Sequence, residues 1–224
     1  MNAAPQVASD ALVRELAAVV GATNVVTDDT ERAFFATDIY RAGALPAAVV
    51  RPASAAEVAA VVRACVARGV AVVPRGGGAS YTDGYVPSED GSISLDTSRM
   101  DRILEINERD MYVVVQVGIT WAELNEALAA RGLRTPFYGP FSGLAATVGG
   151  SLSQNSVTWG TGVFGVSGET PLGVEVVLGT GEVLDTAQIG ASAREAFFRP
   201  YGPDISGLFT GDAGALGIKT AVTL

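Results

Sequence analysis

The sequence predicts an α+β protein built from two lobes. In the N-terminal half, residues 47–73 run strand, helix, strand, which is the order of a βαβ unit and favours a small, partly parallel sheet. The C-terminal half contains paired apolar segments joined by short turns, which favours a larger and mostly antiparallel sheet. Glycines gather in residues 76–84 and 139–181, so we expect glycine loops around a ligand between the lobes.

Composition places the chain among globular proteins. Apolar residues make up 48% and charged residues 17% of its 224 residues. The net charge of −9, without a basic run, argues against a nucleic-acid surface. Residues 1–21 lack the features of a signal peptide, and the most apolar region, 58–73, is too broken by arginines to span a bilayer. The lone Cys65 permits no internal disulfide, which fits a reducing cytoplasm.

The chain contains no histidine. This excludes a Ser-His-Asp triad, a Cys-His pair and histidine-based zinc sites within these residues. Acidic residues are scattered without the spacing of metal ligands, so we expect no metal site. Acid–base chemistry here would depend on Asp, Glu, Tyr, Arg or Lys219, the only lysine.

Capping residues and apolar spacing predict the elements of the first half. Ser9-Asp10 can begin a helix over 11–20, which Gly21 ends, and 25–26 is a short extended piece. The mixed pattern over 28–40 predicts no definite element. The remaining elements are a buried strand at 47–51, a helix from the capping box Ser54–Glu57 to about Arg68, and a strand at 70–73. We expect the two strands to be parallel with a right-handed crossover.

The second half predicts a helix among hairpins. A strand is expected at 92–95, and a hairpin joins 103–106 to 112–117. The capping box Thr120–Glu123 begins a helix that ends near Gly132, and we expect Trp121, Leu124 and Leu128 to be core residues. The tract 136–171 predicts a long functional loop. A hairpin at 174–178 and 182–185, a short helix at 192–198 and a strand at 217–224 complete the chain.

The stretch Val72–Gly84 is the best candidate for a binding site. An apolar strand ends at Pro74 and three consecutive glycines follow, Gly76, Gly77 and Gly78. Glycine permits positive φ and leaves no Cβ in the way, so successive N–H groups can point into one anion-binding concavity. Its natural ligand is a phosphate or pyrophosphate, and the alternative is a flexible surface turn.

Gly160–Gly165 matches the residue pattern of the G-x-G-x-x-G dinucleotide fingerprint but not its structural context. The fingerprint needs a strand before it and a helix after it, whereas residues 153–159 are polar and 167–171 are poor helix formers. The chain has no G-x-x-x-x-G-K-[ST] motif, and Ser142 and Ser167 lack a nucleophile-elbow pattern. These contexts argue against a Rossmann site, a P-loop and a serine hydrolase.

Three ordered motifs over about residues 45–224 carry a family resemblance. The first is Pro74–Ser80, the second runs from Pro140 through Thr147–Gly150 and Asn155 to 165–178, and the third is 202–218. Together they resemble the FAD-binding domain of the vanillyl-alcohol oxidase / p-cresol methylhydroxylase family, nearest its glycolate oxidase and D-lactate dehydrogenase branch.

The resemblance implies a fold of two α/β lobes that hold FAD between them. It implies an N-terminal helical segment at 1–44 and an FAD-binding domain at 45–224, with lobes of about 45–100 and 101–224. It implies FAD as the cofactor, contacted by the following residues: Pro74, Arg75, Gly76, Gly77, Gly78, Ala79, Ser80, Thr82, Pro140, Ser142, Thr147, Val148, Gly149, Gly150, Ser153, Asn155, Gly165, Val166, Gly217 and Ile218. Because the chain contains no histidine and Cys65 lies within a predicted helix, we expect the FAD to be bound non-covalently.

The chain also departs from the family pattern. Asp83 stands where the family usually has Gly, and a carboxylate there would repel phosphate unless it turned away. Asp212-Ala213 replaces a frequent Ser-Glu, and Gly78 stands where some relatives attach flavin through His. The family continues into a substrate (cap) domain after the strand that ends near Leu224.

The implied function is the FAD-binding portion of a flavin-dependent oxidoreductase acting on a 2-hydroxy acid or similar alcohol. Relatives take their substrate-binding groups mainly from the cap domain or a partner, so no catalytic residue is assigned within these residues. Two alternatives remain open: an FAD-binding subunit or fragment without turnover alone, and a non-catalytic scaffold of the same fold.

Overall fold

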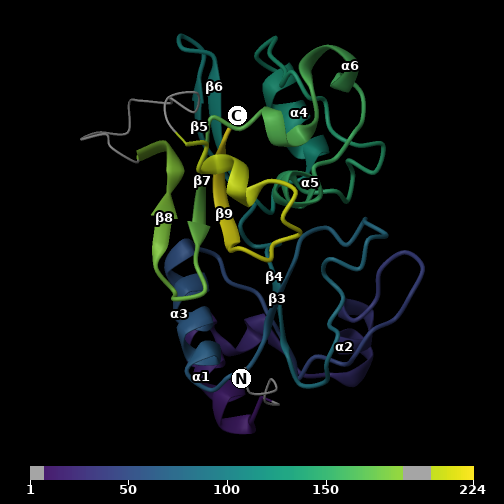
Figure 1. The fold of residues 1–224 in the computed structure, drawn as a ribbon, viewed down its shortest axis with the longest axis vertical. Helices are drawn as coiled ribbons and strands as arrows, with labels where there is room; N and C mark the ends of the chain where they lie inside the picture. Colours follow the sequence, from purple (N-terminus) through teal and green to yellow (C-terminus); the bar gives the residue numbers. More distant parts are fainter. Residues whose placement is uncertain (1–7, 189–202) are drawn as a thin grey trace.

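The computed structural model describes residues 8–188 and 203–224, and within them the strands form two sheets (Figure 1). The first sheet has the strand order β1-β2-β4-β3, and β2 and β3 both run parallel to β4. Its strands are β1 Val25–Val26, β2 Ala48–Val50, β3 Val72–Arg75 and β4 Ile93–Asp96. The two strands of the predicted βαβ unit are therefore parallel, but β4 lies between them.

Two helices cover the first sheet, and both begin at predicted caps. The helix α1 (Asp10–Val20) has Ser9 as its N-cap, and α3 (Ala55–Val66) has Ser54. Only half of the capping box Ser54–Glu57 forms, because the Glu57 carboxylate accepts from the Ala53 N–H instead of the Ser54 N–H. Both helices contribute to one core with β2 and β4. The uncertain segment 28–40 contains a helix, α2 (Asp29–Phe35).

The second sheet has five strands in the order β5-β6-β9-β7-β8, and its pairings are antiparallel. Its strands are β5 Ile103–Asn107, β6 Tyr112–Gln116, β7 Gly173–Val177, β8 Val183–Asp185 and β9 Ile218–Thr223. Both predicted hairpins form. The strand β9 lies between β6 and β7, at the centre of the sheet (Figure 1).

The helices of the second lobe pack beside this sheet (Figure 1). The helix α4 (Trp121–Ala129) has the complete capping box of Thr120 and Glu123, and Trp121, Leu124 and Leu128 are buried as predicted. The expected long loop at 136–171 instead contains two short helices. These are α5 (Val148–Gln154) and α6 (Thr161–Phe164). The 3₁₀ turns of the chain are η1 Ala22–Asn24, η2 Ser167–Glu169, η3 Thr186–Gln188 and η4 Ser206–Phe209.

One apolar cluster joins the two lobes. Val117, Val177 and Ile218 of the second lobe belong to the buried cluster formed by α1, α3 and the first sheet. Arg63 of α3 also donates to the Gly181 carbonyl in the β7–β8 turn at 2.6 Å. These contacts hold the two lobes together and so fix their relative position.

Within residues 8–188 and 203–224, no helix is long and apolar enough to cross a membrane. The short helix predicted at 192–198 lies outside the described residues.

Candidate functional site

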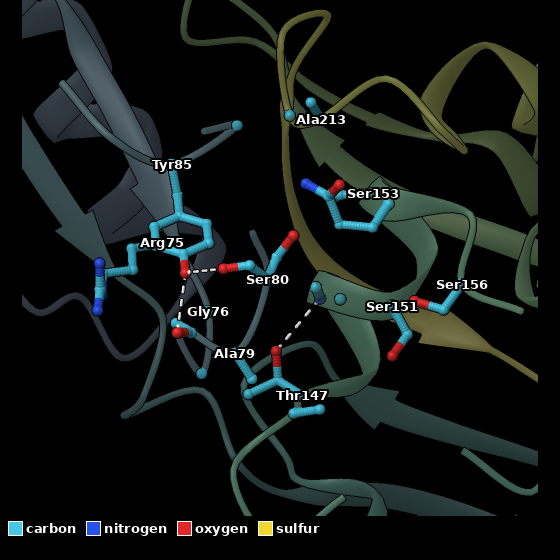
Figure 2. Close-up of a pocket in the computed structure, with 18 of the residues that line it drawn as sticks. Arg75, Gly76, Ala79, Ser80, Tyr85, Thr147, Ser151, Ser153, Ser156 and Ala213 are labelled. Atoms are coloured by element: carbon cyan, nitrogen blue, oxygen red, sulfur yellow. Dashed lines mark hydrogen bonds between the residues drawn. The ribbon is translucent and has the colours of Figure 1, made fainter. Parts of the chain in front are cut away.

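A cleft of about 730 Å³ lies between the two lobes. Its volume falls within the range of ordinary ligand pockets. Three segments form its walls: the glycine loop after β3, the region of α5, and the loop that leads into β9 (Figure 2). The predicted residues that line it are Pro74, Arg75, Gly76, Gly77, Gly78, Ala79, Ser80, Thr82, Pro140, Ser142, Thr147, Gly149, Gly150, Ser153, Asn155, Gly217 and Ile218.

Three predicted residues do not line the cleft. Val148 is fully buried, with Trp121 and Leu152, in the core of the second lobe. Gly165 and Val166 follow α6 outside the lining, and a Cβ at Gly165 would meet the Glu169 carboxylate. The apolar side chain of Val148 packs into that core, and its contact with the cofactor stays a prediction.

The glycine loop keeps a row of backbone donors free. It begins at the carboxyl end of β3, as predicted. Within the described residues, the N–H groups from Gly76 to Thr82 donate no hydrogen bond. Gly77, Tyr81 and Thr82 are exposed, so water satisfies such N–H groups in the free chain, and a ligand that accepts hydrogen bonds can replace that water.

The glycines of the first two motifs allow the walls to approach closely. A Cβ at Gly76 would lie 2.5 Å from Thr147 Oγ1, and one at Gly77 would overlap the Ala145 carbonyl oxygen. A Cβ at Gly149 would lie 2.6 Å from the Val117 Cβ. At these positions a larger residue would clash with neighbouring protein atoms, so packing within the protein itself favours glycine.

The second wall is organised by hydrogen bonds around α5. Thr147 is its N-cap and accepts from the Gly150 N–H at 3.2 Å. Ser151 accepts from the Trp121 indole N–H at 2.8 Å, which ties α5 to α4. Asn155 ends the helix in the left-handed region with φ of 48°, and its side-chain oxygen accepts from the Gly168 N–H. The Asn155 amide therefore shapes the wall rather than projecting a free acceptor.

The third wall is the loop 211–217, which contacts both other walls. Its Ala213 N–H donates to the Ser153 carbonyl, and a Cβ at Gly214 would lie 2.8 Å from Pro74. A buried ion pair supports it: Lys219 Nζ lies 2.7 Å from Asp212 Oδ1. Asp212 also accepts from the Gly214 N–H, so the acid that departs from the family pattern shapes this loop.

The cleft favours an anion. Among the described residues that line it, two are basic, Arg75 and Lys219, and none is acidic, although the chain carries a net charge of −9. Asp83 is turned away: its carboxylate pairs with Arg41 at 2.9 Å and does not line the cleft. Asp83 has φ of 60°, a conformation that favours glycine and so explains the family's usual residue.

Sequence reasoning missed several lining residues. Ile39 lies in the segment that predicted no definite element, and Gln154 ends a helix that glycines concealed. Gln154 accepts from the Thr82 hydroxyl at 2.6 Å, which links the glycine loop to α5. Tyr85 was also missed, although its position directly after the glycine loop was a usable signal.

The fingerprint-like Gly160–Gly165 forms the four-residue α6 after an irregular segment. The required strand does not precede it in the structure. Within the described parts of the chain, no three Cys, Asp or Glu side chains gather in a group that could hold a metal ion.

Comparisons with known proteins agree with this arrangement. Residues 46–187 match the FAD binding domain family. The chain is 33% identical to the glycolate oxidase subunit GlcD of Bacillus subtilis (strain 168) over 176 residues, 79% of this chain and 36% of that protein. It is 32% identical to the mitochondrial D-lactate dehydrogenase [cytochrome] of Arabidopsis thaliana over 204 residues, 90% of this chain and 34% of that protein. The chain thus spans about a third of the length of these relatives.

A solved structure of p-cresol methylhydroxylase with substrate bound has the same fold. The two superpose with a TM-score of 0.83 at 22% identity, over 98% of this chain and 44% of that one. The fold is therefore the predicted α+β arrangement of two lobes, and the match covers the cleft-forming segments. The chain belongs to the FAD binding domain family, which it shares with FAD-linked oxidoreductases.

Proposed function

We propose that this chain is the FAD-binding portion of a flavin-dependent oxidoreductase that oxidises a 2-hydroxy acid or similar alcohol. The family match supports FAD as the cofactor. The substrate class is inferred from the names of the glycolate and D-lactate relatives. Within these residues, the proposed role is to bind and orient the cofactor.

The free N–H groups from Gly76 to Thr82 carry the proposal. Residues 76–82 line a cleft whose described lining contains no acidic residue and two basic ones, Arg75 and the Lys219 that pairs with Asp212. A diphosphate offers many acceptor oxygens and negative charge, so it satisfies these donors without a metal. The residues present therefore fit the diphosphate of FAD.

The other walls suit the remaining parts of the cofactor. We assign the wall from Thr147 to Asn155 to the flavin, because its small residues allow close approach of a flat ring. We assign Gly217 and Ile218 to the adenine, since they combine an apolar surface with backbone hydrogen-bonding groups. Gly165 and Val166 remain predicted contacts that the cleft lining does not support.

The residues that line the cleft would hold the flavin, which would supply the redox chemistry for oxidation of the substrate. The residues of this chain fix its position and shield one side of the cleft from water. The chain lacks histidine, and no acidic side chain lines the cleft within the described residues, so we assign it no general base. We propose that substrate-binding groups lie outside these 224 residues, in a cap domain or a partner subunit.

The test is the absorption spectrum of the purified chain, followed by titration of the apo form with FAD. We expect a flavin spectrum and saturable binding of one FAD per chain. A folded protein that shows neither would contradict the proposal and favour a non-catalytic scaffold.

We further propose that FAD is bound non-covalently. Gly78 stands at the attachment position of some relatives, and Cys65 is buried in α3, away from the cleft. Acid precipitation should leave the yellow colour in the supernatant. Flavin fluorescence from the protein band on a denaturing gel would contradict this.

The alternative of cofactor binding without turnover is tested by flavin bleaching. Stopped-flow mixing with glycolate or D-lactate should bleach the flavin of this chain slowly, whereas dithionite should reduce it, because dithionite needs no substrate pocket. General acid–base help is typically worth about two to four orders of magnitude in rate. Rapid, saturable bleaching by either acid would place a complete active site within these residues. The cytoplasmic location stays a prediction.

A further inference from the structure

The back of the glycine loop is held by the phenol of Tyr85. Its hydroxyl lies 2.8 Å from the Gly78 carbonyl oxygen and 2.6 Å from the Ser80 carbonyl oxygen. Figure 2 shows both contacts, with Tyr85 on one side of the loop and Thr147 on the other. Tyr85 is buried, with 7% of its surface exposed, so these contacts are shielded from water.

These contacts set the direction of the loop's donors. In a planar trans peptide, the C=O and the following N–H point in opposite directions. Since Tyr85 holds the carbonyls of Gly78 and Ser80, the N–H groups of Ala79 and Tyr81 point away from the Tyr85 hydroxyl. Neither N–H has a partner among the described residues.

A buried cation lies beside Tyr85. The Arg75 guanidinium lies 4.6 Å from the Tyr85 ring centre, and 5.4 and 5.3 Å from those of Phe34 and Phe35. It donates to the carbonyls of Phe35 at 3.3 Å and Thr37 at 2.7 Å. Within the described chain it forms no ion pair with a carboxylate. The aromatic faces stabilise the cation without neutralising it.

The Arg75 guanidinium packs against the glycine loop at Gly78. Gly78 has φ of 63°, and a Cβ there would collide with the Arg75 guanidinium. Burial lowers the pKa of Arg75, and Tyr85, Asp96 and Asp38 oppose this shift. Arginine starts from a pKa above 12, so the guanidinium stays charged near neutral pH. Its charge therefore lies directly behind the free N–H groups.

We propose that Tyr85 and Arg75 are positioning residues for a diphosphate. Tyr85 orients the loop's N–H groups by holding the carbonyls, and Arg75 adds a positive charge that forms no ion pair among the described residues. This inference rests on the proposed function, because the diphosphate is that of FAD.

The decisive variant is Tyr85→Phe, which keeps the ring over Arg75 and removes only the hydroxyl. The measurements are the FAD dissociation constant of the apo protein at 15 °C and the thermal unfolding of each apo form. We expect the dissociation constant to rise about tenfold, as for loss of a hydrogen bond that fixes a charged-ligand site. The matched control is Tyr112→Phe, whose hydroxyl contacts Glu105 on the second sheet and lies outside the cleft. It should leave FAD affinity unchanged.

The role of the Arg75 charge is tested with one variant that keeps the charge and one that removes it. Arg75→Lys should retain FAD affinity within about threefold, whereas Arg75→Met should weaken binding more and flatten its dependence on salt. If Arg75→Met fails to fold, the comparison of Tyr85→Phe with wild type decides. Wild-type FAD affinity in Tyr85→Phe, with or without a lower unfolding temperature, would show that Tyr85 has a purely structural role. That result would overturn this inference but not the proposed function. A wild-type protein that binds no FAD would overturn the proposed function and this inference together.

Discussion

Lys219 and Asp212 form a buried ion pair at the edge of the cleft. Their charged atoms lie 2.7 Å apart and both side chains are 3% exposed. Lys219 projects from the central strand β9, and Asp212 belongs to the loop that precedes it. Burial lowers the pKa of Lys219, while the hydrogen bond and charge of Asp212 oppose this. Lys219 therefore depends on Asp212 to remain charged inside the protein.

Removing one partner should be costly. We expect Lys219→Met to lower the free energy of unfolding by about 3–5 kcal/mol, because it leaves the Asp212 carboxylate buried without its cation. Adding Asp212→Asn should recover part of that loss, since the amide is neutral. Urea unfolding of the apo forms measures both. The exposed pair Arg131–Glu108 is the control, and Arg131→Met should cost under about 1 kcal/mol. Equal losses at both pairs would contradict this.

Arg41 should protect the cleft from the charge of Asp83. Arg41→Ala frees that carboxylate, so we expect FAD binding to weaken by roughly two- to fivefold at low salt and less at high salt. Asp83→Asn in the same chain should restore affinity. Arg109→Ala removes one positive charge from the β5–β6 turn and should have no such effect. A loss in Arg41→Ala that the second substitution leaves unchanged would exclude this electrostatic explanation.

Cys65 should be unreactive until the protein unfolds. Burial in α3 raises the pKa of its thiol to about 12, from a usual 9.0, so at pH 8.5 the thiolate is about three orders of magnitude scarcer than in an unfolded chain. Thiol labelling should require urea. The raised pKa also contributes stability that is fully present below pH 9 and lost as pH rises from 9 toward 12. Fast labelling of the native form would contradict the burial.

Gly149→Val should damage the apo fold itself. The added side chain would overlap Val117 at the end of β6, so we expect a loss of at least 1–3 kcal/mol from overpacking. Gly162→Val is the control, since a Cβ there meets nothing within 4 Å. A Gly149→Val protein of normal apo stability that lost only FAD binding would contradict this.

Local sequence signals predicted the elements that depend on local chemistry. Ser9, Ser54 and Thr120 all begin helices, and both hairpins follow from alternating apolar residues around short turns. The helix α5 was missed because Gly149 and Gly150 have poor helix propensity, and tertiary packing against Val117 overrides it.

Long-range placements could not be predicted locally. The insertion of β4 between β2 and β3 and the central position of β9 depend on contacts between distant segments. The role of Asp83 depends on Arg41, which nothing nearby in sequence indicates. The glycine loop could be predicted because its backbone donors belong to consecutive residues. The contact of the Tyr85 hydroxyl with the carbonyls of that loop forms only when the chain folds back on itself. The proposed boundaries at 44/45 and 100/101 stay predictions.

The central position of β9 has a consequence for synthesis on the ribosome. The helices α1 and α3 and the first sheet are encoded entirely before residue 97, so this unit can begin to fold early. The strands β6 and β7 must wait for β9, which is translated after both of them and fills the gap between them. Until then they present unpaired edges, which are prone to wrong association. The nascent chain therefore passes through a period in which the first sheet can already be formed, while the second sheet still lacks its central strand and exposes the edges of β6 and β7.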